Sequence, residues 1–127
     1  MRRFVIIDDD PINNHICAKY IDLVFTGANV LSYTNPQLAL DHIITEYRAG
    51  TLQDTIMLLD INMPVLTGWD VLDQFSAFPA EIINQFVIYI LSSSIASEDK
   101  TRADENSLVS GFLEKPLSVE QIQAILQ

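Results

Sequence analysis

Four carboxylates that could share a cation follow two short apolar runs of the chain. Asp8, Asp9 and Asp10 come directly after the first run, and Asp60 comes directly after a later one. Carboxylates held within a few ångström of one another repel, and a hard divalent cation with oxygen ligands removes that repulsion. Because no cysteine or histidine follows these runs, Zn²⁺ is disfavoured. The donor set predicts Mg²⁺, with Mn²⁺ as a substitute.

A hydroxyl and a cation follow two further apolar runs, at Ser92 and Lys115. When a metal ion and an ammonium group neutralise phosphoryl oxygens, a carboxylate can attack phosphorus as a nucleophile. Asp60 stands alone at the end of its run, whereas Asp8 and Asp9 are adjacent and better placed to share a metal. We therefore predict Asp60 as the phosphoacceptor.

Each of these features has a plainer interpretation when it is taken alone. Three consecutive carboxylates are favourable in a solvated turn before a helix. A serine after a strand often begins a loop, and Lys115 before Pro116 is unremarkable in isolation. A shared site is indicated because carboxylate, hydroxyl or ammonium side chains follow four separate apolar runs.

The elements that must position these residues alternate regularly along the chain. Short apolar runs predict five strands, and amphipathic stretches with capping residues predict five helices. Strands are expected at residues 3–7, 29–33, 55–59, 86–91 and 111–113, and helices begin near Pro11, Pro36, Trp69, Ser97 and Ser118.

This alternation predicts an α/β fold, a doubly wound parallel sheet with helices on both faces. Ligands of such sheets bind at the carboxyl ends of the strands, so Asp8, Asp60, Ser92 and Lys115 should converge there. The helix expected at 97–106 has few apolar anchors, Ala103 among them. We expect it to be the least firmly docked helix.

Length and charge restrict the partners. The chain has 127 residues, 7 basic and 17 acidic side chains and a net charge of −10, and we expect a single domain over residues 1–127. Nucleic acid and anionic membranes need clustered basic residues, so neither is an expected partner. The lone Cys17 cannot form an internal disulfide, and no apolar run is long enough to span a membrane. We expect a reducing, cytoplasmic location.

The chain resembles the receiver domain of bacterial two-component response regulators over essentially its full length. The acidic pair of that family matches Asp8 and Asp9, and its K-P pair matches Lys115 and Pro116. Its hydroxyl position after the fourth strand matches Ser92. The family pattern D-x-x-M-P-x-x-x-G matches Asp60, Met63, Pro64 and Gly68.

The resemblance implies a flavodoxin-like fold with strand order 2-1-3-4-5 and a role as a phosphoprotein in phosphorelay signal transduction. Asp60 would accept a phosphoryl group from a sensor histidine kinase or a histidine phosphotransfer protein. Asp9, Asp60 and the backbone carbonyl of Asn62 would bind Mg²⁺, and Asp8 would help mainly through water. Ser92 and Lys115 would hold the phosphoryl oxygens.

The resemblance also implies a switch and an output. The hydroxyl residue Ser92 would couple to an aromatic ring, here Phe112, although simple core packing is the alternative for that ring. Ser92 stands where threonine is commoner in the family, and Phe112 stands where tyrosine is commoner. The readout surface would be the helix at 97–106, the strand at 111–113 and the last helix, and the peptide bond before Pro116 would be cis.

The leading interpretation is a stand-alone response regulator that binds a downstream protein and has no external enzymatic turnover, with a phosphorylation-dependent homodimer left open. One alternative is a small phosphatase with an aspartate nucleophile, because Asp8, Asp10 and Ile12 loosely match its D-x-D-x-[TV] pattern. In that enzyme Asp8 would be the nucleophile. The other alternative is an adaptor with the same fold that takes no phosphate.

Overall fold

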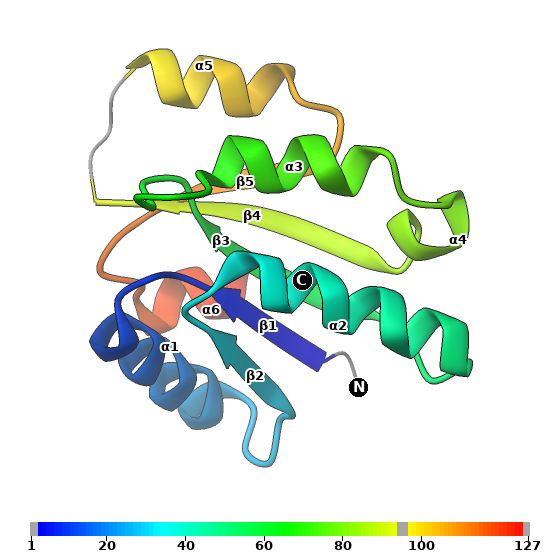
Figure 1. Ribbon diagram of the computed structural model, residues 1–127. Helices are drawn as coiled ribbons and strands as arrows, with labels where there is room; N and C mark the ends of the chain where they lie inside the picture. Colours follow the sequence, from blue (N-terminus) through cyan, green and yellow to red (C-terminus); the bar gives the residue numbers. More distant parts are fainter. Residues whose placement is uncertain (1–2, 94–96, 126–127) are drawn as a thin grey trace.

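Five parallel strands form the central sheet, in the order β2-β1-β3-β4-β5. The computed structural model describes residues 3–93 and 97–125 (Figure 1). Both the parallel sheet and its strand order are as predicted. The strands are β1 (Arg3–Ile7), β2 (Val30–Tyr33), β3 (Thr55–Asp60), β4 (Phe86–Ser92) and β5 (Val109–Glu114).

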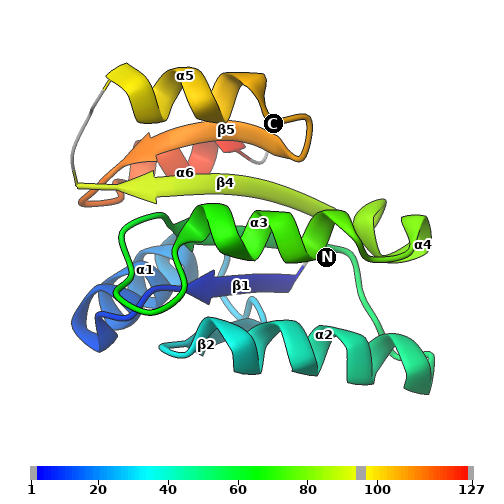
Figure 2. The same ribbon diagram turned by 45° about the horizontal axis from the view of Figure 1, so that its top comes forward.

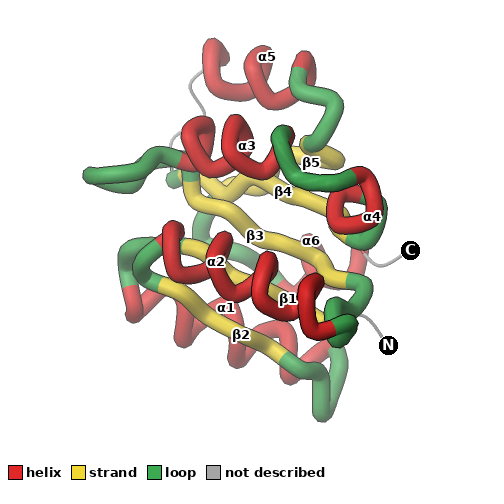
Figure 3. Tube along the Cα trace, turned by 45° about the vertical axis from the view of Figure 1, so that its right-hand side comes forward, coloured by secondary structure: helices red, strands yellow, loops and turns green. Residues whose placement is uncertain are grey.

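Helices cover both faces of the sheet, so that the strands form the middle layer of three (Figure 3). One face carries α1 (Pro11–Val24) and α6 (Val119–Ile125), whereas the other carries α2 (Pro36–Ala49), α3 (Gly68–Ser76), α4 (Ala80–Ile83) and α5 (Ser97–Glu105). The expectation of five helices was therefore one short in the described residues. The extra helix is α4, a single turn that begins after Pro79 and buries only Ile82.

Burial explains why some strands were easier to predict from the sequence than others. Every residue of β1 and β3 is buried, because helices cover both faces of these strands. The edge strand β5 is longer than the predicted 111–113, since it begins at Val109 and includes the exposed Ser110 and Glu114. Because these polar residues face solvent, they interrupt the apolar run from which the full length of the strand could have been predicted.

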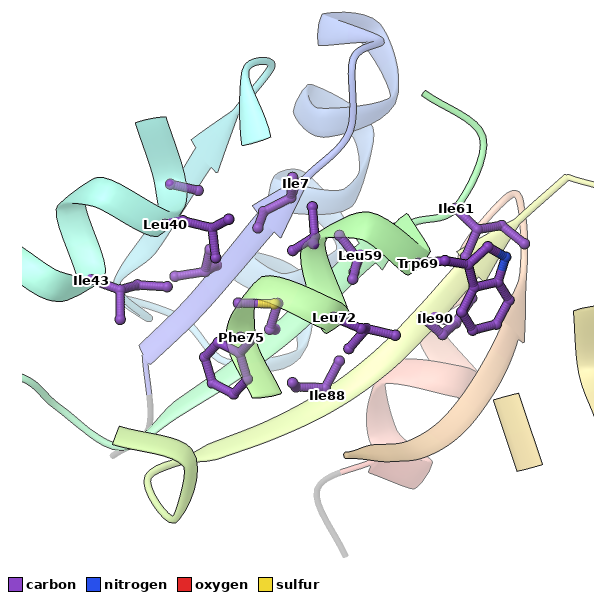
Figure 4. Packing of buried hydrophobic residues seen from close by; sticks show 14 of the residues in the cluster. Ile7, Leu40, Ile43, Leu59, Ile61, Trp69, Leu72, Phe75, Ile88 and Ile90 are labelled. Carbon is purple, nitrogen blue, oxygen red and sulfur yellow. The ribbon is translucent and has the colours of Figure 1, made fainter. Parts of the chain in front are cut away.

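Two apolar cores lie on opposite faces of the sheet. The larger core joins the strands to α2 and α3, and Figure 4 shows Leu40 and Ile43 of α2 and Leu72 and Phe75 of α3 pointing toward the sheet. The smaller core joins the strands to Cys17 of α1 and to α6. Each fully buried aliphatic or aromatic side chain contributes about 1.5–3 kcal/mol of transfer free energy. Together these cores hold the strand ends in place.

Local capping fixes where the helices begin after the strands. The Asp10 carboxylate accepts a hydrogen bond from the Ile12 amide at 2.9 Å and so caps α1. Asn35 caps α2, and Thr67 and Asp70 form a reciprocal capping box that begins α3. Caps of this kind typically stabilise a helix by about 1 kcal/mol. They also determine the path of each loop at the carboxyl edge of the sheet.

Helix α5 buries few of its described side chains. Among its described side chains only Ala103 is buried, in agreement with the few apolar anchors in its sequence. The Arg102 guanidinium also lies over the ring of Trp69, 4.5 Å from its centroid. This contact links α5 to α3. No helix in the described part of the chain is long and apolar enough to cross a membrane.

Candidate functional site

The carboxyl ends of four strands bring the predicted residues to one edge of the sheet. Figure 2 shows the arrowheads of β1, β4 and β5 pointing to the same side of the molecule. Asp8 directly follows β1, Asp60 ends β3, Ser92 ends β4, and Lys115 directly follows β5. The parallel sheet therefore gathers residues that are far apart in the sequence.

The ammonium group of Lys115 contacts two of the carboxylates. Its Nζ lies 2.6 Å from Asp8 Oδ2 and 3.3 Å from Asp60 Oδ1. The Lys115 backbone amide donates to the Ser92 carbonyl at 2.8 Å, which fixes the loop after β5 against the end of β4. The peptide bond between Lys115 and Pro116 is cis.

Three carboxylates form an acidic cluster around this cation. Asp8, Asp9 and Asp60 each offer an oxygen atom, and these atoms lie within 4.8 Å of one another. Asp8 is fully buried and Asp60 is 4% exposed, whereas Asp9 is exposed. Three oxygen donors with one open side suit a hard cation such as Mg²⁺, which keeps several waters.

The charge balance of the cluster favours an added cation. Burial raises the pKa of the Asp60 carboxyl, and the nearby Asp8 charge raises it further, while Lys115 and the Asn62 amide lower it in part. For Lys115, burial alone would lower the pKa, but the hydrogen bond and charge of Asp8, followed by Asp60, raise it above its ordinary value. Lys115 therefore stays charged at neutral pH, yet it does not fully offset the carboxylates. The residues present fit a divalent cation.

Asp8 is held by the first turn of α1. Its Oδ1 accepts from the Asp10 amide at 2.9 Å, and its Oδ2 accepts from Asn13 Nδ2 at 2.7 Å. Asn14 Nδ2 donates to the backbone carbonyl of Asp8 at 3.0 Å. Sequence reasoning missed Asn13 and Asn14. A usable signal was present, because a helix that begins at Pro11 places both in its first turn, beside the strand end.

The loop after Asp60 folds tightly over the strand end. The Asn62 amide lies 3.3 Å from Asp60 Oδ1, and the Gly68 amide donates to the Ile61 carbonyl at 3.2 Å. A Cβ atom on Gly68 would lie only 2.6 Å from the Asp60 carbonyl oxygen. Glycine is therefore required at this position by close backbone approach. Met63 of the same loop is buried in the larger core.

Ser92 and Phe112 lie on neighbouring strands at this end of the sheet. Ser92 is fully buried. Phe112 is opposite Ile90 in the register of β4 and β5, and it is half-buried against the larger core. The described geometry thus brings Asp8, Asp9, Asp60 and Lys115 into one cluster, with Ser92 at the adjacent strand end. Phe112 lies along β5 and is half-buried.

Comparisons with known proteins agree with this architecture. Residues 4–127 match the family model of the response regulator receiver domain. A curated protein of Methanothrix harundinacea, named "Probable methanogenesis regulatory protein FilR2", is 28% identical over 127 residues. The match covers 98% of this chain and 79% of that protein.

Two crystal structures superpose closely on the chain. A two-component response regulator from Cytophaga hutchinsonii has a TM-score of 0.90 and 27% identity, with 99% of this chain and 94% of that chain covered. A response regulator receiver protein from Dyadobacter fermentans has a TM-score of 0.88 and 22% identity, with 99% and 95% covered. With the family model matching nearly the whole chain, this protein belongs to the response regulator receiver domain family.

Proposed function

We propose that this protein accepts a phosphoryl group on Asp60 from a phosphohistidine of a sensor histidine kinase or a histidine phosphotransfer protein. The observation that supports this proposal most strongly is the environment of Asp60. Its carboxylate is nearly inaccessible, lies 3.3 Å from the Lys115 ammonium and shares a cluster with Asp8 and Asp9. A nucleophile placed between a cation and a metal-binding cluster is suited to phosphoryl transfer.

The reaction forms one bond and breaks one. An oxygen of Asp60 attacks phosphorus, and the phosphorus–nitrogen bond of the donor breaks. The electron pair of that bond returns to the imidazole nitrogen of the donor, which becomes neutral or takes up a proton. The product is an aspartyl phosphate, with the phosphoryl oxygens directed toward the cluster.

Asp8, Asp9, Asp60 and the backbone carbonyl of Asn62 are the groups that would hold Mg²⁺. A bound Mg²⁺ neutralises charge on the phosphoryl oxygens during transfer. Lys115 supplies the second positive charge, and its ammonium would turn from Asp8 toward a phosphoryl oxygen. Ser92 would donate its hydroxyl to another phosphoryl oxygen.

The same proposal assigns the output to the surface formed by α5, β5 and α6. When Ser92 moves toward the phosphoryl group, Phe112 would turn inward and α5 would shift. Helix α5 is suited to this because its described side chains bury little more than Ala103. A switch element needs two arrangements within a few kcal/mol of each other. The shifted surface would bind a downstream protein or a second copy of this chain.

In this role the protein takes the phosphoryl group onto its own Asp60 and later loses it by hydrolysis, and it does not turn over an external substrate. We place it in a reducing, cytoplasmic compartment, where the thiol of Cys17 stays reduced. Neither nucleic acid nor a membrane surface is part of the proposal, because the net charge of −10 opposes both.

Acetyl phosphate tests the proposal without knowledge of the natural kinase. The purified chain is incubated with this donor in the presence and absence of Mg²⁺, and its intact mass is measured. We expect a single phosphoryl adduct that forms only with Mg²⁺. Turnover of a generic phosphate ester that is lost in Asp8→Asn would instead favour the phosphatase alternative.

A further inference from the structure

Within residues 3–93 and 97–125, Asp8 Oδ2 accepts two hydrogen bonds, and they come from different parts of the chain. Lys115 Nζ donates from the loop after β5 at 2.6 Å, and Asn13 Nδ2 donates from the first turn of α1 at 2.7 Å. The other oxygen, Oδ1, accepts from the Asp10 amide at 2.9 Å. Asp8 is fully buried, so these protein donors take the place of water.

The two donors to Oδ2 differ in how firmly they are placed. Asn13 lies on a helix that is capped by Asp10 and anchored by the Asn14 contact to the Asp8 carbonyl. The second hydrogen of its amide points to the buried sulfur of Cys17, with Nδ2 3.7 Å from Sγ. The amide cannot be flipped without bringing its oxygen against the Asp8 carboxylate. Its donor is therefore directed at Oδ2.

Lys115, by contrast, is shared between partners. Its long side chain already contacts both Asp8 and Asp60. If phosphoryl transfer occurs as proposed above, the ammonium turns to a phosphoryl oxygen and Oδ2 loses this donor. Leaving a buried carboxylate oxygen without a hydrogen-bond partner is unfavourable, because the oxygen has lost its water and gains nothing in return. Asn13 is the donor that stays.

We propose that Asn13 is a positioning residue for the metal site. Its amide holds Asp8 in the orientation that binds Mg²⁺, and it becomes the remaining side-chain donor to Asp8 Oδ2 when Lys115 moves to the phosphoryl group. This inference rests on the proposed function. Groups that orient metal-binding carboxylates typically change metal affinity 10–100-fold when they are removed.

Titration calorimetry with Mg²⁺ on the full, unphosphorylated chain tests this assignment. Asn13→Leu keeps the approximate volume and removes the donor, and we expect the Kd for Mg²⁺ to rise about tenfold. Asn13→Gln keeps an amide donor and should recover most of the affinity. His15→Leu, at an exposed position of the same helix, should bind like wild type. Circular dichroism checks folding, and Asn13→Ala replaces Asn13→Leu if the latter does not fold.

The same measurement in a Lys115→Ala background tests the second half of the proposal. Without Lys115, Asn13 is the side-chain donor to Oδ2 that remains among the described residues, so Asn13→Leu should raise the Kd by a larger factor than it does in wild type. If Asn13→Leu raises the Kd by the same factor in both backgrounds, Asn13 does not replace Lys115 as the donor to Asp8 Oδ2, and this half of the proposal is wrong.

The outcomes separate this inference from the proposed function. Suppose that wild type binds Mg²⁺ and that the Kd of Asn13→Leu lies within about twofold of the wild-type Kd, which is well below the usual effect of losing such a donor. The assignment of Asn13 is then wrong, and the phosphoacceptor proposal stands. If Asn13→Leu is weakened but Asn13→Gln is not restored, the role of Asn13 is packing and not donation. If wild type itself binds no Mg²⁺, the proposed metal site fails first.

Discussion

Lys115 Nζ lies 2.6 Å from Asp8 Oδ2, although the two residues are 107 positions apart in the sequence. Asp8 follows β1 and Lys115 follows β5, and β3 and β4 lie between these strands in the sheet. The ion pair therefore forms only when β1, β3, β4 and β5 are assembled side by side. Asp60, at the end of β3, lies within reach of the same ammonium group at 3.3 Å.

Asp60→Asn should abolish phosphorylation and leave the fold intact. Burial and the Asp8 charge raise the pKa of the Asp60 carboxyl, so the ionised group is less favourable in the folded chain than in the unfolded chain. A neutral amide removes that repulsion, and the Tm should be equal to or higher than that of wild type. Intact mass and thermal unfolding measure the two effects. Asp73→Asn, at an exposed position of α3, is the control and should be phosphorylated like wild type. If Asp60→Asn takes up one phosphoryl group per chain as wild type does, Asp60 is not the acceptor.

Lys115→Ala should permit slow phosphorylation and block the conformational response. The ammonium neutralises and holds a phosphoryl oxygen, so its loss slows transfer and uncouples the adduct from the loop after β5. Hydrogen exchange across α5 and β5, with and without acetyl phosphate, is the measurement. Lys19→Ala, exposed on α1, should respond like wild type. A Lys115→Ala adduct with the exchange pattern of phosphorylated wild type would refute this role.

Arg102→Ala should loosen α5 without affecting the acceptor. The exposed Arg102 guanidinium lies 4.5 Å from the centroid of the buried Trp69 ring, and a cation–π contact at the protein surface contributes about 0.5–1 kcal/mol. Because α5 buries little else, hydrogen exchange in residues 97–105 should become faster, and Trp69 fluorescence should change. Lys100→Ala on the same helix is the control. Unchanged exchange in Arg102→Ala would show that the ring contact does not anchor the helix.

Gly68→Ala should damage the site through the backbone. Its new Cβ would lie 2.6 Å from the Asp60 carbonyl oxygen and 2.7 Å from Ile61 Cα, and neither atom can move alone. We expect a loss of about 1–3 kcal/mol in the free energy of unfolding and slower phosphorylation. Gly111→Ala is the matched control, because its Cβ would meet the half-buried ring of Tyr89 at 2.9 Å, which can turn aside. Equal effects of the two substitutions would contradict this account.

Cys17 should make the fold less stable in alkaline solution. Burial, and then the Asp8 charge, raise the pKa of the thiol from 9.0 to about 11. Between these values the unfolded chain releases the thiol proton and the folded chain keeps it, so stability falls as pH rises through this window. Urea unfolding at the two ends of the window should show a smaller fall for Cys17→Ala than for wild type. Identical falls would mean that the thiol pKa is not shifted.

The fold was predictable because its strongest signals are local. Strands β1 and β3 are buried on both faces, so their sequences are nearly continuous apolar runs. The start of α2 was visible in Asn35 and Pro36. The ends of β5 were not, because Ser110 and Glu114 face solvent, and α4 was missed because one helical turn has too few residues to show a period.

The candidate site was predictable to the level of its strand ends and no further. Parallel topology alone brings Asp8, Asp60 and Lys115 together. The contacts of Asn13 with Asp8 and of Arg102 with Trp69 depend on how helices rotate against the sheet and on one another. Side-chain directions of that kind are set by tertiary packing, which short-range patterns in the sequence do not encode.

The position of the phosphoryl group is the most direct test of the central claim. Wild type is phosphorylated with acetyl phosphate and Mg²⁺, the acyl phosphate is reduced with borohydride, and the modified residue is identified by peptide mass spectrometry. The account predicts one modified residue, Asp60, and no modification when Mg²⁺ is removed. Modification at Asp8, or an adduct that forms equally without Mg²⁺, would contradict it.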